Sequence, residues 1–135
     1  MDKALNYLAL GRKGGLVELG EEPVGAAARA GKAYLMVVAA DAGDHTWRRA
    51  KSYAAGTEQQ CIRVTFTKDE LGMAIGRTSL AMAAFTDAAL ALAFAKALEK
   101  QPSDVIEVLE AKAKRLKRRQ QEAKAHQRNV RKGKK

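Results

Sequence analysis

Positively charged side chains crowd the end of the chain, and phosphate binding is the chemistry that such side chains perform. Residues 111–135 carry twelve lysines and arginines against one acid, Glu122, whereas the other 110 residues carry thirteen basic and fourteen acidic side chains. The net charge of +10 therefore resides in this segment, where each cation can replace a counterion on a polyanion such as RNA. The densest block, which we expect to contact phosphate, consists of Lys112, Lys114, Arg115, Lys117, Arg118 and Arg119.

Nucleophiles and metal ligands are scarce. Cys61 is the only cysteine, so the chain forms no internal disulfide, and its place in the run CIRVTF favours a small strand residue over a reactive thiol. His45 and His126 are the only histidines, which makes a metal site or a catalytic base improbable. Since no catalytic constellation is recognisable either, we expect neither an enzyme nor a cofactor.

Four basic residues outside the terminal block are further candidates for RNA contact. Arg77 follows a glycine in a loop, where a guanidinium can stack on a base or pair with phosphate. Arg12 and Lys13 end a helix, and they are as well explained by phosphate contact as by solvation. Lys32 follows a turn glycine, where an ordinary turn lysine is the competing explanation.

A third helix carries aromatic and basic residues that we assign to structure. Trp47 is the only tryptophan, and in an amphipathic helix it more often packs against the body than stacks on a base. Arg48 and Arg49 point about 100° apart on a helix, so they cannot act as one clamp, and we expect both to be solvated.

Apolar periodicity predicts strands that alternate with helices, which indicates an α/β sheet covered by helices on both faces. The run KAYLMVVAAD is typical of a strand buried on both faces. Thr67 with Glu70 forms a capping box, while Asp44, and either Thr86 or Asp87, are expected to cap other helices. The predicted helices span 3–13, 21–31, 45–56, 69–75 and 87–100, and the predicted strands span 16–19, 32–41, 61–66 and 80–85.

The last helix follows Pro102, and Asp104 with Glu107 is expected to cap it. An apolar stripe runs along it as far as Leu116 and then stops, which predicts that its first turns dock on the body and the rest projects as a charged rod. We therefore expect one α/β domain over residues 1–100 and a basic helical tail over residues 101–135 whose end is disordered.

Three segments, taken in order, resemble one family. They are GLVELGEEPVGAAARAGKAYLMVVAADAGDHTWRRAK, FTKDELGMAIGR and LAMAAFTDAALA, and the most specific piece is LGMAIG. Together they are similar to the kink-turn RNA-binding ribosomal protein family of the L-seven-Ae type, and especially to its small bacterial homologues. The resemblance covers about residues 5–98 and leaves the basic tail outside.

This resemblance implies a three-layer α/β/α sandwich with a mixed four-stranded sheet. It also implies recognition of structured RNA, a kink-turn or a bulge, by two loops. The first loop would read sheared G·A pairs, and the second would pack against an extruded nucleotide. The corresponding residues here are Gly20, Glu21 and Glu22 in the first loop and Gly76, Arg77, Thr78 and Ser79 in the second.

Three positions in the second predicted helix differ from what the family leads one to expect, and they leave an alternative open. Glu22 and Pro23 stand where an amide side chain and a glutamate are usual, and Ala26 stands where a lysine is usual. The alternative is a protein-interaction module on the same fold that has lost kink-turn recognition and binds a partner through its C-terminal helix. Without a signal peptide or a long apolar run, we expect a cytoplasmic protein that does not enter a membrane.

Overall fold

Helices cover both faces of a mixed four-stranded sheet in the computed structural model, which describes residues 2–133 and the side chains of residues 2–127. The strand order is β1-β4-β2-β3, in which β2 and β3 are parallel and the other pairs are antiparallel. The elements in the described residues are α1 (Lys3–Lys13), β1 (Val17–Leu19), α2 (Glu21–Arg29), β2 (Leu35–Val38), α3 (Asp44–Ala54), β3 (Gln60–Arg63), α4 (Lys68–Ala74), β4 (Met82–Phe85), α5 (Ala88–Ala97) and α6 (Ser103–Gly133).

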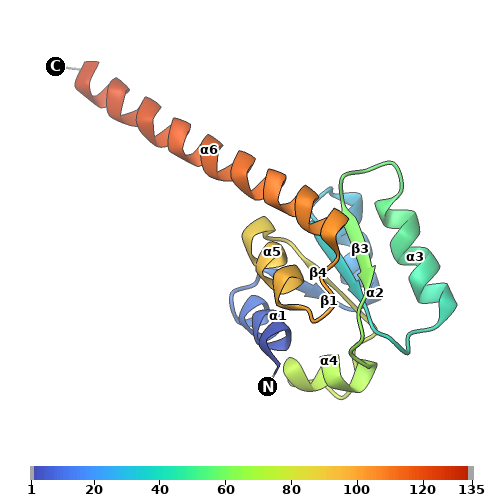
Figure 1. Ribbon diagram of the computed structural model, residues 1–135. Helices are drawn as coiled ribbons and strands as arrows, with labels where there is room; N and C mark the ends of the chain where they lie inside the picture. Colours follow the sequence, from blue (N-terminus) through green and yellow to red (C-terminus); the bar gives the residue numbers. More distant parts are fainter. Residues whose placement is uncertain (1, 134–135) are drawn as a thin grey trace.

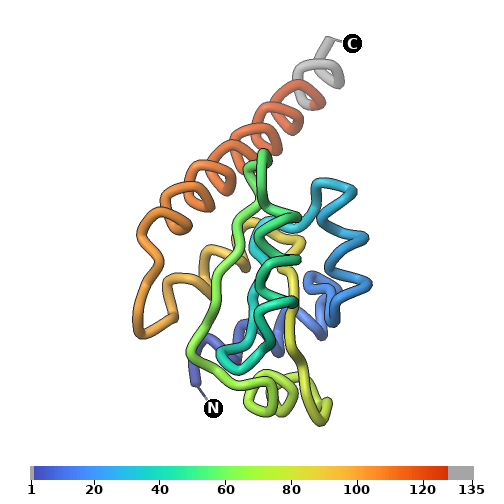
Figure 2. The backbone as a smooth tube through the Cα atoms, turned by 90° about the vertical axis from the view of Figure 1, so that its right-hand side faces the viewer, coloured from blue at the N-terminus to red at the C-terminus, as the bar shows by residue number. Residues whose placement is uncertain are grey.

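The layers are those of an α/β/α sandwich. Helices α2 and α3 lie on one side of the sheet, and α1 and α5 lie on the other, with α6 packed outside α5 (Figure 1). Helix α4 lies across the edge of the sheet where β2 ends and β4 begins, whereas α6 projects beyond the opposite edge, where β2 begins (Figures 1 and 2). The fold class expected from the sequence is confirmed.

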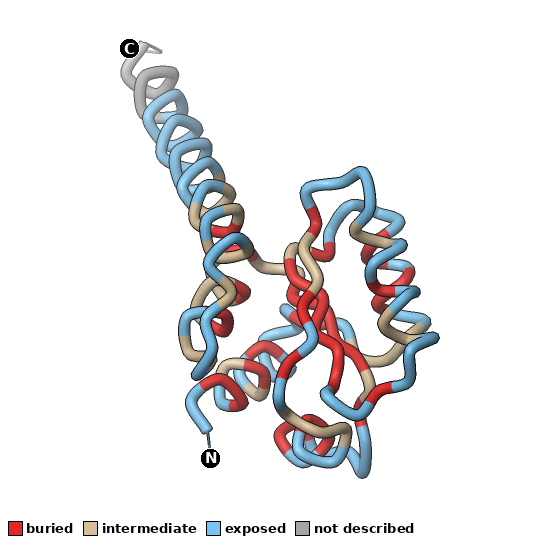
Figure 3. The backbone as a smooth tube through the Cα atoms, turned by 45° about the vertical axis from the view of Figure 1, so that its right-hand side comes forward, coloured by how far each residue is buried: buried red, intermediate tan, exposed pale blue. Residues whose placement is uncertain are grey.

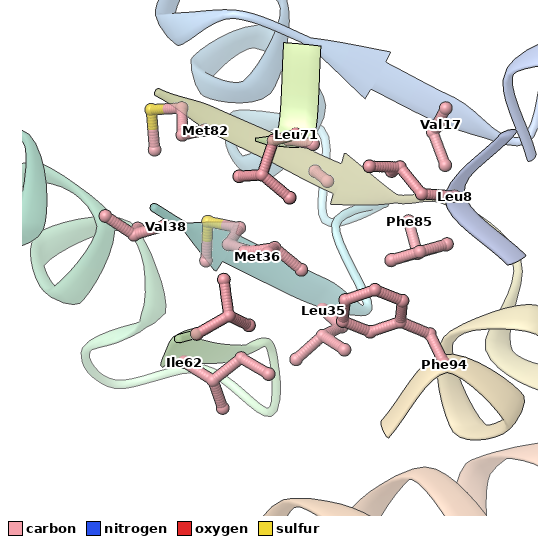
Figure 4. Packing of buried hydrophobic residues seen from close by; sticks show 14 of the residues in the cluster. Leu8, Val17, Leu35, Met36, Val38, Ile62, Leu71, Met82, Phe85 and Phe94 are labelled. Carbon is pink, nitrogen blue, oxygen red and sulfur yellow. The ribbon is translucent and has the colours of Figure 1, made fainter. Parts of the chain in front are cut away.

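The two central strands form the middle of the core. Every residue of β2 and β4 is fully buried, because helices cover both faces of these strands. Figure 3 shows this buried centre between helices whose outer faces are exposed. The rings of Phe85 and Phe94 lie 4.9 Å apart and join β4 to α5, beside Leu8 of α1 (Figure 4). The prediction of a strand buried on both faces is therefore confirmed for β2.

One buried polar side chain ties α2 to the neighbouring strands. Gln59 accepts a hydrogen bond from the N–H of Ala33 at 2.9 Å and donates to the carbonyl of Ala28 at 3.1 Å. Both partners are backbone groups at the end of α2 and the start of β2, so the amide satisfies groups that would otherwise be buried without partners.

Helix starts agree with the sequence at two places and differ at two. The capping box of Thr67 and Glu70 is present, and Asp87 rather than Thr86 caps α5 by accepting from the N–H of Leu90 at 2.9 Å. Asp44 does not cap α3, because Gly43 is the N-cap and Asp44 occupies the first helical position, where its charge faces the positive helix end.

Helix α6 also begins earlier than expected. The carbonyl of Pro102 accepts the first helical hydrogen bond, from the N–H of Ile106 at 2.9 Å. Asp104 therefore lies inside the first turn and is not the cap that the sequence suggested. The sequence predicts disorder at the end of the tail. The structure describes no side chains after residue 127 and does not describe residues 134 and 135, so this disorder stays a prediction.

Candidate nucleic-acid interface

Two loops that are far apart in the sequence meet at the edge of the sheet that α4 closes. Strand β1 ends where β4 begins, because the two strands pair antiparallel with Leu19 opposite Ala83. The N–H of Gly20 donates to the carbonyl of Met82 at 3.0 Å and fixes the start of α2 against the loop that leads into β4. The structure thus brings together the two segments that the family resemblance singled out.

The start of α2 is open and has backbone donors to offer. Gly20 is its N-cap, with a φ of 96°, and makes no side-chain cap. Such a φ favours glycine, since a Cβ atom would be strained there. The N–H of Val24 bonds to the carbonyl of Gly20, and Pro23 has no N–H. The N–H groups of Glu21 and Glu22 therefore remain without partners inside the helix, at its positive end.

The two glutamates at this helix start differ in their surroundings. Oε1 of Glu21 is buried and lies 3.5 Å from Nη1 of Arg49, so the arginine balances its charge. Nη2 of Arg49 also lies 3.1 Å from Nε2 of His45, so the arginine is exposed, as we expected, and makes these two contacts as well. Glu22 is exposed, which leaves one free carboxylate at the edge.

The second loop is shaped by two glycines of the LGMAIG segment. A Cβ atom on Gly72 would lie 2.7 Å from the backbone nitrogen of Ser79 and 2.8 Å from the carbonyl oxygen of Arg77. The loop over residues 76–79 thus rests directly on the backbone of α4. Gly76 has a φ of 73° and turns the chain after the helix. Arg77, Thr78 and Ser79 are all exposed on this loop.

Replacing Gly72 with alanine should lower the free energy of unfolding by about 1–3 kcal/mol, because the atoms that the new methyl group meets are backbone atoms that must move. Urea denaturation measures the change. Gly14→Ala is the matched control, since its Cβ would meet only ordinary contacts of 3.5 Å or more at a φ of −85°. Equal stability of the two variants would contradict the close packing of the loop on α4.

Arg12 joins the second loop from α1. Its Nη1 atom lies 3.6 Å from the position of a Cβ on Gly76, and its side chain is exposed. Lys13 is the next residue and is also exposed, at the end of α1. Arg12 and Arg77 therefore supply guanidinium groups to one loop, an association that residues 65 positions apart do not reveal in the sequence.

Met73 belongs to this edge, although sequence analysis did not select it. Its side chain is 78% exposed, and its carbonyl accepts a hydrogen bond from the N–H of Gly76. Leu71 and Ala74 are buried on the other face of the short helix. The sequence signal that could have identified Met73 is a large apolar side chain on the outer face of a short helix, where a polar residue is expected.

Lys32 lies at the other edge of the sheet. It follows α2, whose nine residues place it about 13 Å along the helix axis from Gly20. The N–H of Tyr34, two residues later, bonds to the carbonyl of Phe85, which is the last residue of β4. The structure therefore separates Lys32, a candidate for RNA contact in the sequence, from the Gly20 loop.

The first turns of the apolar stripe of α6 pack against the body. Leu109 is fully buried, and Val105 and Ile106 pack against the core. Lys96 of α5 and Glu110 of α6 form an ion pair of 3.3 Å along the same contact. The stripe is therefore used within the chain as far as Leu109, whereas its later part lines a cleft between α5 and α6, so the surface left to the protein-interaction alternative is reduced to this cleft.

Lys112 anchors α6 and is not one of the freely available cations. Its ammonium lies 2.9 Å from Oε2 of Glu58 and 5.6 Å from the centre of the Tyr34 ring, and its side chain is 22% exposed. The hydrogen bond and the charge of Lys112, together with the charge of Arg115, lower the pKa of Glu58. The other members of the basic block are exposed, namely Lys114, Arg115, Lys117, Arg118 and Arg119.

Other kinds of site find little support in the described residues. No group of three or more His, Cys, Asp or Glu side chains within them is placed to hold a metal ion. Burial raises the pKa of the Cys61 thiol, against a smaller lowering effect of the Lys51 charge. No helix in the described part of the chain is long and apolar enough to cross a membrane.

The fold occurs among solved structures. A protein of unknown function from Bacillus halodurans is 25% identical and superposes with a TM-score of 0.68, over 74% of this chain and 100% of that one. The 15.5 kDa RNA-binding protein of Giardia lamblia is 18% identical and superposes with a TM-score of 0.59, over 81% of this chain and 86% of that one. No family model and no curated protein matches the sequence.

Proposed function

We propose that the protein is a non-enzymatic RNA-binding protein that recognises kinked or bulged RNA, of the kink-turn kind, at the edge where α2 begins. The observation that supports this proposal is the hydrogen bond between Gly20 and Met82, which holds the start of α2 against the first residue of β4, three residues after the second loop. RNA is generally recognised where its helix is interrupted, since bases are accessible there. The Giardia protein, which shares the fold and is an RNA-binding protein, supports the proposal.

In this mechanism each group at this edge binds a different part of the RNA. The N–H groups of Glu21 and Glu22 donate to the RNA backbone at the positive end of α2. The free carboxylate of Glu22 accepts from a base amino group, as carboxylates do with cytosine. Because Arg49 balances the charge of Glu21, only one uncompensated negative charge faces the RNA at this helix start.

The second loop holds an extruded nucleotide. Met73 offers an exposed apolar surface to the face of its base, next to the turn at Gly76. Arg12 and Arg77 supply guanidinium groups to its phosphates, for which the planar fork is well suited. The remaining free cations of α6 add affinity that does not depend on sequence and that falls as salt rises.

Binding of the full-length protein to a kink-turn RNA tests the proposal. A mutant RNA without the G·A pairs is compared at the same near-physiological salt, with fluorescence anisotropy as the readout. We expect the mutant RNA to bind at least about tenfold more weakly, because the loss of one specific contact typically costs 1–3 kcal/mol. Equal or absent binding of both RNAs would contradict it and assign the function to the tail or to a protein partner.

A further inference from the structure

The two basic regions of the molecule face opposite edges of the sheet. Gly20 and the loop over residues 76–79 lie at the edge that α4 closes, whereas α6 passes the edge at which β2 begins and projects away from it (Figures 1 and 2). The strand residues between the two edges, from Tyr34 to Val38, span about 13 Å. An RNA segment seated at the first edge therefore does not pass the second edge unless it wraps around the body.

A cleft of about 200 Å³ lies at the second edge, between the body and α6. It is lined by Tyr34, Lys112, Arg115, Leu116 and Arg119. The spacing of the α6 residues places them on one face of the helix, one turn after another. An aromatic ring with guanidinium groups beside it is the composition of sites for single-stranded nucleic acid.

One positive charge of the cleft anchors the helix, and two others remain available to bind phosphate. Glu58 pairs with Lys112 of the cleft, with 2.9 Å between Oε2 and Nζ. Within the residues whose side chains are described, Arg115 and Arg119 form no ion pair, and both are exposed. Two guanidinium groups thus remain for phosphate, on a helix that the Lys112 anchor holds in place.

We propose that the cleft between Tyr34, Arg115 and Arg119 is a second RNA-binding site, which takes a single-stranded segment other than the RNA at the Gly20 edge. One molecule would then connect two RNA segments. The inference rests on the proposed function for its first RNA, while the second site stands on its own geometry. Lys32, two residues before Tyr34, adds a further cation at the same edge.

The test uses the full-length protein with two RNAs. A complex with an unlabelled kink-turn RNA is formed first, and a fluorescent single-stranded RNA of unrelated sequence is then titrated into it while anisotropy is recorded. We expect a ternary complex, whose composition of one protein and one copy of each RNA is checked by analytical ultracentrifugation. Displacement of the kink-turn RNA by the single strand would overturn the proposal, because it would show a shared site.

Two double variants with the same loss of charge separate the cleft from the tail as a whole. Arg115→Gln with Arg119→Gln should weaken binding of the single strand about tenfold, since both phosphate contacts are lost. Lys114→Gln with Arg118→Gln removes two exposed cations that point elsewhere on the same helix, and it should have less than about a third of that effect. Equal loss in both variants would overturn the proposal in favour of a diffuse charge effect.

The two proposals fail in different ways. A single strand that binds with the expected dependence on Arg115 and Arg119, although no kink-turn RNA binds, would support the second site and contradict the proposed function. A kink-turn RNA that binds specifically, with no single strand recruited, would overturn the second site and leave the proposed function intact. Circular dichroism of each variant checks that α6 is still formed.

Discussion

A chain that ends at Lys100 is expected to lose about 3–5 kcal/mol of its free energy of unfolding, although it keeps every strand. The reason is that Leu109 is fully buried in the core and Val105 and Ile106 pack against it from α6. Removing one buried leucine typically costs 2–5 kcal/mol, and truncation also uncovers the face of α5 beneath it. Urea denaturation, followed by circular dichroism, measures the loss.

A second truncation separates stability from charge. A chain that ends at Gln120 keeps the packed turns of α6 and the Lys112–Glu58 pair, so its midpoint of unfolding should stay close to that of the full chain. When both are measured at low salt, this truncated chain should bind RNA more weakly than the full chain, because the cations after Gln120 are lost. If both truncated chains were as stable as the full chain, the contribution of α6 to the core would be disproved.

Reversing the charges of Arg12 and Arg77 together is expected to weaken binding of a kink-turn RNA by about 3 kcal/mol, or about a hundredfold. The Arg12 guanidinium lies beside the turn at Gly76, and Arg77 is the next residue of that loop, where the extruded nucleotide is proposed to lie. Arg12→Glu with Arg77→Glu would therefore replace attraction by repulsion at the site itself. Isothermal titration calorimetry at near-physiological salt gives the difference in affinity.

The control has the same change in net charge at another place. Arg29→Glu with Arg48→Glu alters two exposed arginines of α2 and α3, outside the Gly76 turn. It should weaken binding only through the general loss of positive charge, by about tenfold or less. A similar loss in both double variants would show that Arg12 and Arg77 have no special place in recognition.

The sequence predicted those features that are local in the chain. The apolar runs predicted buried central strands, and Thr67 with Glu70 predicted a helix start that the structure confirms. Gly31 has the positive φ expected of a residue that follows a helix. Each of these depends on neighbours within a few residues, so the pattern alone contains the information.

Contacts between distant residues could not be predicted in this way. Lys112 belongs to a run of similar cations, and only the path of α6 across Glu58 and Tyr34 makes it an anchor. Arg49 is paired with Glu21 because α3 packs beside α2, which charge patterning within α3 does not reveal. Two local features were also predicted wrongly: the caps expected at Asp44 and Asp104 lie one or two residues earlier, because the carbonyls of Gly43 and Pro102 begin these helices.

The buried position of Leu109 also has a consequence for the order of folding during synthesis. Helix α5 is complete at Ala97, yet the leucine that covers it is added twelve residues later. Until α6 docks, the folding chain exposes an apolar part of α5 and of the core that Leu109 covers in the finished protein, so a chain interrupted before Leu109 is the form most open to aggregation or chaperone binding.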